Sequence, residues 1–364
     1  MKRLLCIISS MNAGGAETFL MKVYRQLDKS KYQMDFCISE SKKGFYNNEI
    51  CEMGGKIYVI PCKSQNVRLF KKMLKEIVFQ NQYKYVMRIT SNALGFYDLK
   101  IAKKAGAERC IVRSSNSSDG GSYKKLAHII GKLLFKKYID VKIAPSDLAA
   151  KYTFGKKDYK NHNVKILHNA LDLNAYQYSL EWREVIRKEL GIIEDTFVVG
   201  HVGRFSKQKN HMFLLEIFSQ ICIRKNSAML LLIGQGELKK EIVQCAKKLG
   251  IDKKIIFAGI RKDIPQLLSA MDILVFPSLY EGMPNTVIEA QATGLPCIIA
   301  DTITKEADIT GLVKYESLNK SATEWAKEAM EIAKKPRINT KEKFIHAGYD
   351  IESVTKEFEQ MIFE

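Results

Sequence analysis

Short apolar runs alternate along the whole chain with segments of helical spacing. Around residue 70, for example, apolar residues recur every three or four positions, the period of a helix with one buried face. Strands that alternate with helices form parallel sheets covered by helices on both faces. The predicted strands are residues 4–8, 34–38, 57–60, 85–89, 110–113, 141–144, 164–167, 197–202, 230–233, 255–257, 273–276 and 297–300.

This pattern occurs twice, and 364 residues are long for one domain but comfortable for two. The fold class expected is therefore α/β, with two Rossmann-like, doubly wound parallel-sheet domains. We place the first domain at residues 1–170 and the second at residues 171–348, and expect the helical segment 349–364 to pack back on the first domain. Because ligands of such folds bind beyond the carboxyl ends of the strands, we expect a site in a cleft between two facing domains.

The formal net charge of +18 is distributed unevenly. Residues 1–170 hold 32 Lys and Arg against 13 Asp and Glu, a surplus of +19, whereas residues 171–364 hold 26 against 27. Such asymmetry indicates that the first half faces an anionic partner, either nucleic acid or an anionic membrane leaflet.

The cysteines and the N-terminal residues indicate the compartment. Eight cysteines lie far apart, without C-x-x-C spacing, and most fall in apolar runs, which favours a reducing cytoplasm. The apolar stretch that begins at Leu4 ends at Ser9, too short for a signal peptide, and no run reaches the ~20 apolar residues of a spanning helix. We therefore expect a cytoplasmic protein that is neither exported nor membrane-spanning.

Two glycine-containing loops are candidates for phosphate binding. Gly14 and Gly15 lie between the first strand and a helix, where the backbone can approach a phosphate or a sugar at the helix N-terminus. Their spacing is not G-x-G-x-x-G, so a nicotinamide or flavin dinucleotide is not indicated. A tight turn with a good helix start explains the pair equally well.

The second loop follows the strand 197–202. Gly203, Arg204 and Lys209 follow this strand and precede a helix, and fixed cations beside a closely approaching backbone suit a diphosphate. The alternative is a solvated basic loop. The glycine directly at the strand end favours the binding site.

The most informative segment is residues 277–290, between the strand 273–276 and a helix. Glu281 is predicted to lie on the loop and Glu289 two turns into the helix, both at the same cleft mouth. The first amides of the helix, near Met283, Asn285 and Thr286, would face the cleft with the positive end of the helix dipole. One carboxylate could then hold sugar hydroxyls and the other ribose hydroxyls. The E-x7-E spacing alone carries little weight, because it also occurs at residues 181/189 and 316/324.

Taken in order, these motifs resemble the GT-B glycosyltransferases of carbohydrate-enzyme family four, in particular the branch that assembles bacterial capsular and exopolysaccharides. The resemblance covers nearly the whole chain. It is carried by residues 14–17, 202–204 with Lys209, 234–236, 257–259 and 281–289.

The resemblance implies a retaining, metal-independent transferase with a UDP-linked nucleotide-sugar donor and a growing, lipid-linked glycan as acceptor. The second domain would bind the nucleotide. Arg204 and Lys209 would hold the diphosphate, Glu281 would contact the sugar and Glu289 the ribose hydroxyls. The other donor-binding residues would be Gly14, Gly15, Gly203, Gly259, Ile260, Arg261, Gly282, Met283, Pro284, Asn285 and Thr286.

One position departs from the family. Members commonly carry a histidine that reaches the transferred sugar after the strand that here ends at Arg113. Ser115 occupies that place, followed by Asn116, so these two residues are the candidates for this contact, and we expect the contact to the sugar, and with it the choice of donor, to differ from the family's.

No metal and no cofactor are expected. The chain has no D-x-D pair, the usual carboxylate clamp on a nucleotide-sugar diphosphate, and its six histidines show no H-x3-H spacing. Of the histidines, only His201, next to the candidate phosphate loop, is considered for a role at the site.

The segment 123–138 has apolar residues on one helical face, with Lys124, Lys125, Lys132 and Lys136 on the other. The favoured interpretation is a helix whose apolar face packs on its own sheet and whose lysines are solvated. The alternative is a helix at an anionic membrane surface, which a lipid-linked acceptor at the inner face of the membrane would require.

Two other functions stay open at this point. A GT-B nucleotide-sugar epimerase would need catalytic carboxylates and a histidine in the cleft. A non-catalytic nucleic-acid-binding protein would need aromatic side chains interleaved with lysines, but the aromatic residues here lie mostly in apolar runs. Nucleic acid is therefore not expected as a partner.

Overall fold

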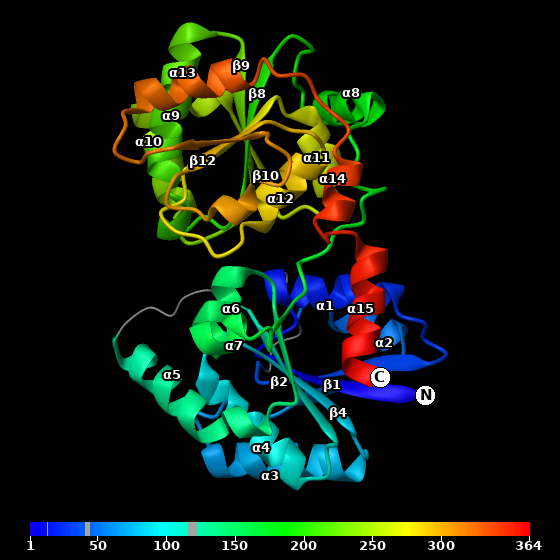
Figure 1. The fold of residues 1–364 in the computed structure, drawn as a ribbon. Coiled ribbons are helices and arrows are strands. Elements are labelled where there is room, and N and C mark those ends of the chain that lie inside the picture. The colour runs from blue at the N-terminus through cyan, green and yellow to red at the C-terminus, as the bar shows by residue number, and fades with distance from the viewer. Residues whose placement is uncertain (13, 41–43, 116–121) are drawn as a thin grey trace. The chain divides into compact units, whose positions relative to one another are not determined.

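The computed structural model describes residues 1–12, 14–40, 44–115 and 122–364, with only the backbone of residues 122–124. The chain forms two compact units, Met1–Leu171 with Gly348–Glu364, and Asp172–Ala347. Each has a parallel sheet, which confirms the predicted α/β class with two such domains (Figure 1). All eight cysteines are free thiols.

The sheet of the first unit has the strand order β3-β2-β1-β4-β5-β6-β7. Every strand pairs in parallel with its neighbours, and the order reverses between β1 and β4, as in a doubly wound fold. The strands are β1 (Lys2–Ile7), β2 (Tyr32–Ile38), β3 (Ile57–Val59), β4 (Tyr85–Thr90), β5 (Arg109–Ser114), β6 (Val141–Ala144) and β7 (Lys165–Ile166).

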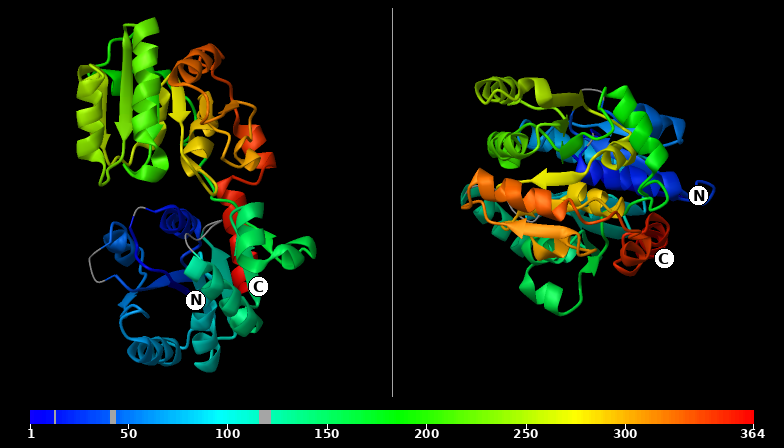
Figure 2. Two further views of the ribbon diagram at one scale, coloured as in Figure 1. Left: turned by 90° about the vertical axis from the view of Figure 1, so that its left-hand side faces the viewer. Right: turned by 90° about the horizontal axis from the view of Figure 1, so that it is seen from above.

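Helices cover both faces of this sheet (Figures 1 and 2). One buried cluster joins the sheet to α1, α2 and α15, and another joins its opposite face to α3, α4 and α6. The helices are α1 (Gly15–Gln26), α2 (Asn47–Glu52), α3 (Val67–Gln80), α4 (Phe96–Lys104), α5 (Ser122–Phe135), α6 (Asp147–Phe154), α7 (Lys156–Lys160) and α15 (Ile351–Phe363), with 3-10 turns η1 (Ala93–Gly95) and η2 (Lys136–Tyr138).

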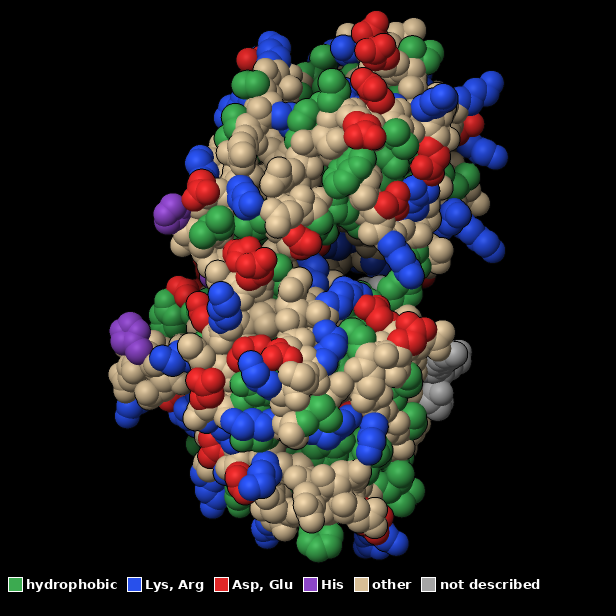
Figure 3. Space-filling model, turned by 90° about the vertical axis from the view of Figure 1, so that its right-hand side faces the viewer, with side chains coloured by type: hydrophobic (Ala, Val, Ile, Leu, Met, Phe, Trp, Pro, Cys, Tyr) green, Lys and Arg blue, Asp and Glu red, His purple; other side chains and the backbone are tan. Residues whose placement is uncertain are grey.

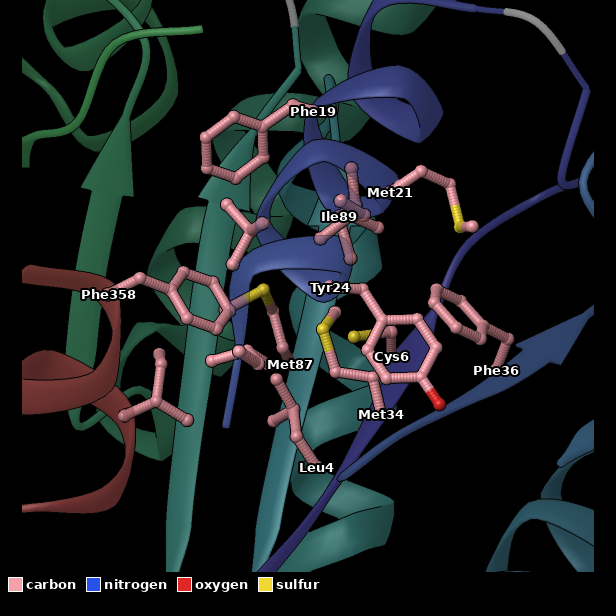
Figure 4. Packing of buried hydrophobic residues seen from close by; sticks show 14 of the residues in the cluster. Leu4, Cys6, Phe19, Met21, Tyr24, Met34, Phe36, Met87, Ile89 and Phe358 are labelled. Carbon is pink, nitrogen blue, oxygen red and sulfur yellow. The ribbon is translucent and has the colours of Figure 1, made fainter. Parts of the chain in front are cut away.

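The helix α15 belongs to the first unit although it follows the second unit in sequence. Asp350 caps it by accepting a hydrogen bond from the Ser353 amide (3.0 Å). Phe358 packs edge-on against Phe19 of α1, with ring centroids 6.4 Å apart, in the cluster shown in Figure 4. At the other end of α15, Phe363 stacks on Tyr32 of β2 (4.4 Å).

The sheet of the second unit has the strand order β10-β9-β8-β11-β12-β13, again with parallel pairing throughout. Five of the strands were predicted. The sixth, β13, was missed because it is a short edge strand with exposed and charged positions. The strands are β8 (Phe197–Val202), β9 (Ala228–Ile233), β10 (Ile255–Gly259), β11 (Ile273–Phe276), β12 (Cys297–Ala300) and β13 (Val313–Glu316).

The helices of the second unit form two groups. α9 contacts both α10 and α13, and α11 contacts both α8 and α12. Ser321 and Glu324 form a reciprocal capping box that fixes the start of α13. The helices are α8 (Leu180–Glu189), α9 (His211–Arg224), α10 (Lys239–Lys248), α11 (Ile264–Ala270), α12 (Asn285–Ala292), α13 (Ala322–Ile332) and α14 (Lys341–His346), with 3-10 turns η3 (Lys207–Lys209), η4 (Asp252–Lys254) and η5 (Lys305–Ala307).

The structure contradicts the favoured interpretation of segment 123–138. The side chains of Leu126, Ile129 and Leu133 on α5 are exposed, whereas Lys132 donates a hydrogen bond to the Tyr152 carbonyl (2.6 Å). The apolar face of this helix therefore points away from its own sheet. Among the described residues, no helix is long and apolar enough to cross a membrane.

Charged side chains of both signs are interspersed on the face drawn in Figure 3. The positive surplus of the first half is therefore not gathered into a single patch on that face.

Candidate functional site

The strand order of the second unit brings two candidate loops together. β8 and β11 are neighbours in the sheet, although β9 and β10 lie between them in the sequence. Their carboxyl ends therefore open side by side at the point where the order reverses, which is where doubly wound sheets bind ligands. The loops that follow are residues 203–210 and 277–284.

Hydrogen bonds join these two loops directly. The Leu279 amide donates to the Gln208 carbonyl (2.9 Å), and the Gln208 side-chain amide donates to the Tyr280 carbonyl (2.9 Å). Asn210 adopts a left-handed backbone (φ 54°) and donates from Nδ2 to the Pro277 carbonyl (3.2 Å). These hydrogen bonds hold the two loops together as one surface, which we call the ledge (residues 203–210 and 277–284). Because the loops are fixed to each other, the side chains on them are held in place.

Lys209 and Glu281 meet on this ledge. The Lys209 Nζ lies 2.7 Å from Glu281 Oε1, and the two side chains are only 16% and 10% exposed. The same ammonium lies 4.5 Å from the centre of the Phe276 ring, the last residue of β11. A cation and a carboxylate, 72 positions apart in the sequence, are thus held together at the sheet edge.

Glycines allow the loops after β8 and β9 to pack closely. A Cβ on Gly234, which has φ +135°, would lie 2.1 Å from the Gly203 carbonyl oxygen. A Cβ on Gly236 would lie 2.3 Å from the Phe205 carbonyl oxygen. Only residues without a side chain fit these contacts, which gives residues 234–236 a packing role beside the phosphate-loop candidate.

Helix α12 starts at the same edge. It begins after Pro284 without a side-chain cap, and Thr286 donates from its hydroxyl to the Val202 carbonyl at the end of β8 (3.3 Å). The first amides of a helix have no acceptor within it and carry the positive end of its dipole. Glu289, half-exposed, is the fifth residue of α12, so it lies one turn into the helix and not two.

The two predicted arginines lie in ion pairs. Arg204 Nη2 is 3.1 Å from Glu237 Oε2, and both side chains are more than half exposed. Arg261 pairs with Asp263 (2.5 Å) and Glu189 (2.8 Å). Arg204 would have to leave Glu237 to reach a ligand beside Lys209, and Arg261 is held beside α8 and α11.

The remaining predicted residues of the second unit lie at the carboxyl ends of β10 and β11. Gly259 ends β10 with φ +70°, and its carbonyl accepts from the Gly234 amide (2.8 Å). Ile260 is 58% exposed and Gly282 and Met283 are half-exposed, so their surfaces are accessible at this edge.

The two histidines behind Lys209 are core residues. His201 is fully buried and donates from Nδ1 to the Val275 carbonyl (2.9 Å), and its ring lies 4.7 Å from that of His211. Burial lowers the pKa of His201 well below its usual value and that of His211 to about 4. Both rings are therefore neutral near pH 7, and they pack in the core beneath the ledge.

In the first unit, Gly14 and Gly15 start α1, with Gly14 at the N-cap. A Cβ on Gly14 would lie 2.4 Å from Glu17 Oε2, and burial raises the pKa of this carboxyl group. Ser115, where the family histidine is expected, is exposed and donates its amide to the Thr90 carbonyl (3.1 Å). Asn116 lies outside the described residues.

Sequence reasoning missed two features at the carboxyl edge of the first sheet. Arg113 is buried, its guanidinium lies 3.6 Å over the Phe19 ring, and burial lowers its pKa to about 9. The buried carboxylate of Asp98 pairs with Lys63 (2.7 Å) and Arg88 (2.9 Å) beside a cavity of about 90 Å³. Both features join residues far apart in sequence, so no local motif could have indicated them.

Among the residues that the structure describes, no group of three or more His, Cys, Asp or Glu side chains is arranged to hold a metal ion.

These loops and strands match a known family. Its model, "Glycosyl transferases group 1", matches residues 183–350, which include both loops of the ledge. A putative glycosyltransferase of Bacillus subtilis, EpsF, is 33% identical over 358 residues, covering 96% of this chain and 93% of that protein. The chain belongs to the group 1 glycosyl transferases. The resemblance inferred from the motifs is thereby confirmed.

Further comparisons span most of the chain. One relative is the N-acetylgalactosamine-N,N'-diacetylbacillosaminyl-diphospho-undecaprenol 4-alpha-N-acetylgalactosaminyltransferase of Campylobacter jejuni, 24% identical over 83% of this chain and 81% of that one. The crystal structure of Anabaena HepE in complex with UDP and glucose has a TM-score of 0.78 at 19% identity, with 99% of both chains covered. This likeness shows the GT-B fold. A third relative, 24% identical over 99% of this chain and 98% of its own length, is named the capsular polysaccharide biosynthesis glycosyltransferase CapH of Staphylococcus aureus.

Proposed function

We propose that this glycosyltransferase moves a sugar from a UDP-sugar to a lipid-linked glycan with retention at the anomeric carbon and without a metal ion. The observation that carries the proposal is the ledge at the ends of β8 and β11. There Lys209 and Glu281 lie 2.7 Å apart beside the start of α12.

In this mechanism Lys209 and the positive end of α12 stabilise the negative charge that grows on the leaving diphosphate. Arg204 joins them after exchanging Glu237 for a phosphate oxygen, an exchange favoured by the exposure of that ion pair. Glu281 accepts hydrogen bonds from sugar hydroxyls, and Glu289 accepts them from the ribose. No side chain is assigned as a covalent nucleophile. The acceptor hydroxyl attacks the anomeric carbon on the face that the diphosphate leaves, and its proton passes to the departing phosphate oxygen.

The nature of the donor and of the acceptor is supported by the relatives. HepE, by its description, was crystallised with UDP and glucose, and the Campylobacter relative is named for a diphospho-undecaprenol substrate. A uridine nucleotide and a polyprenyl-diphosphate-linked acceptor are therefore the classes proposed here. Such an acceptor places the enzyme peripherally at the inner face of the cell membrane, where the basic first half suits an anionic leaflet.

Metal independence follows from the same charges, since Lys209, Arg204 and the helix dipole do the work of a divalent ion. Activity is therefore expected to persist in excess EDTA. Loss of activity in EDTA that manganese or magnesium restores would contradict this part of the mechanism.

The test of the whole proposal is a panel of nucleotide-sugars, each measured for thermal stabilisation and for slow hydrolysis. A ligand that binds only the folded state at 100 times its Kd stabilises it by about 2.7 kcal/mol. UDP and one UDP-sugar should raise the Tm. That UDP-sugar should also be hydrolysed slowly to UDP and the free sugar. Release of an epimerised sugar would instead support the epimerase, and stabilisation by nucleic acid alone would support the nucleic-acid-binding alternative.

A further inference from the structure

Helix α5 docks on its own domain through small and polar residues. His128 is 4% exposed, accepts a hydrogen bond at Nδ1 from the Ala93 amide (3.0 Å) and donates from Nε2 to the Tyr152 carbonyl (3.0 Å). One turn along, a Cβ on Gly131 would lie 2.4 Å from the Ala93 carbonyl carbon. The histidine and the glycine therefore fix the inward face of the helix, and the apolar residues are left on the other side.

The outward face of α5 is a continuous apolar row. Its members follow the i, i+3, i+4, i+7, i+8 spacing of a single helical face. They are Leu126 (57% exposed), Ile129 (54%), Ile130 (41%), Leu133 (79%) and Leu134 (54%). Figure 1 shows α5 at the rim of the first unit, where it packs against α4 and the 3-10 turns η1 and η2. Exposed apolar residues gathered in this way mark an interaction surface.

All charged residues of the segment that carries this apolar row, residues 122–138, are positive. Residues 122–138 contain no Asp or Glu, and Lys125 and Lys137 are exposed beside the row. Lys100 of α4 lies under the C-terminal end of α5, with its ammonium 5.5 Å from the centre of the Phe135 ring. Lys136 pairs with Asp158 (2.8 Å) and so faces the domain, and the side chain of Lys124 lies outside the described residues.

We infer that the apolar row of α5 inserts into an anionic membrane leaflet and anchors the first domain by burial of its leucines and isoleucines, with the lysines at headgroup level. The row is convex and helical, which suits insertion at the acyl boundary of a bilayer. Exposed lysines along a helix without acidic residues match anionic headgroups and would repel a basic partner. The inference deepens the proposed function, from which it takes the lipid-linked acceptor.

Anchoring by apolar burial differs from attraction by charge in its response to salt. Electrostatic attraction decays within a Debye length of about 8 Å at physiological ionic strength, whereas the burial of apolar side chains does not. Binding is therefore expected to weaken at high salt but to persist, and to depend mainly on the leucines.

The test is co-sedimentation of the full chain with vesicles of phosphatidylglycerol and phosphatidylcholine, at low and high salt. The double variant Leu133→Asn/Leu134→Asn should lower the partition coefficient by at least about tenfold per leucine, because burying a leucine is worth roughly 1.5–3 kcal/mol. The matched control is Ile193→Asn/Ile223→Asn, which changes two apolar residues of the second unit that are 77% and 75% exposed. The control should bind as the unchanged protein does.

A second readout locates the contact. Tryptophan fluorescence of Leu133→Trp should be quenched by brominated lipids, and that of Ile193→Trp should not. Equal quenching of both, or equal binding by the leucine variant and the unchanged protein, would overturn the inference. So would a dimer in analytical ultracentrifugation that the leucine variant abolishes without any change in vesicle binding, since the row would then bind a second copy.

The leucine variant also separates this inference from the proposed function. Stabilisation by UDP reports the donor site and needs no lipid, so it should be the same in the variant and in the unchanged protein. Vesicle binding without any UDP effect would refute the proposed function and leave the α5 surface standing. A UDP effect without vesicle binding would refute the surface alone.

Discussion

Replacing Lys209 by methionine should weaken the binding of UDP much more than that of uridine. The ammonium lies 2.7 Å from Glu281 and is 16% exposed, so methionine fills a similar space but removes the charge. A lost hydrogen bond to a charged group costs about 1.5–3 kcal/mol, which corresponds to roughly 10- to 150-fold in Kd. The loss has a second part, because the Glu281 carboxylate is left without its cation and repels the diphosphate.

Isothermal titration calorimetry with UDP and with uridine measures this difference directly. Lys207→Met is the matched control, because Lys207 lies on the same loop but is exposed. Its affinity for UDP should be nearly unchanged. The double variant Lys209→Met/Glu281→Gln should recover part of the loss, since the uncompensated carboxylate is gone. An unchanged affinity of Lys209→Met for UDP, or an equal loss for uridine, would refute the role of Lys209 at the diphosphate.

The remaining predictions concern the ribose and the buried histidines. Glu289→Ala should weaken UDP binding by about 1.5–3 kcal/mol and abolish the preference for UDP over 2'-deoxy-UDP in calorimetry; a retained preference would remove Glu289 from the ribose. The folded pKa of His211, about 4, lies below its unfolded value of 6.5, so the unfolded state binds more protons between these values, and stability falls as the pH drops through this window. Urea titrations should show a loss of about 2 kcal/mol between pH 7.5 and pH 5, and a smaller loss in His211→Phe. An equal loss in both proteins would assign the pH dependence elsewhere.

Most of the fold could be predicted because parallel strands buried on both faces read as continuous apolar runs. The edge strand β13 could not, since its alternating, charged sequence Val313–Glu316 does not form such a run. The meeting of Lys209 with Glu281 could be expected from the rule that strand ends share one edge of a sheet. The pairing of Arg204 with Glu237 could not, because the two side chains are exposed and lie on loops 33 positions apart, where no buried pattern fixes the pair.

The orientation of α5 was predicted wrongly for a different reason. Periodicity shows that a helix has an apolar face, but the choice of the face that docks depends on the surface beneath it. Here the closeness of Ala93 admits Gly131 and not a larger residue, and His128 bridges two backbone groups. These contacts outweigh the burial of the leucines, and the pattern of apolar residues in the sequence does not reveal them. A glycine and a histidine one turn apart were the only local signal.

The position of α15 has a consequence for the order in which the chain can fold during synthesis. The first unit needs Val354, Phe358 and Ile362 in its buried cluster, and the Lys2 ammonium donates to the Phe363 carbonyl (2.7 Å), 361 positions away. A ribosome has therefore made the whole second unit before the first can bury the surface of α1 that α15 covers. At synthesis rates of about 5–20 residues per second, the nascent chain spends roughly 10–35 seconds translating residues 172–347 with that surface uncovered. We expect the uncovered surface of α1 to be open to chaperones that bind apolar segments during that interval, until α15 has been made and packs on it.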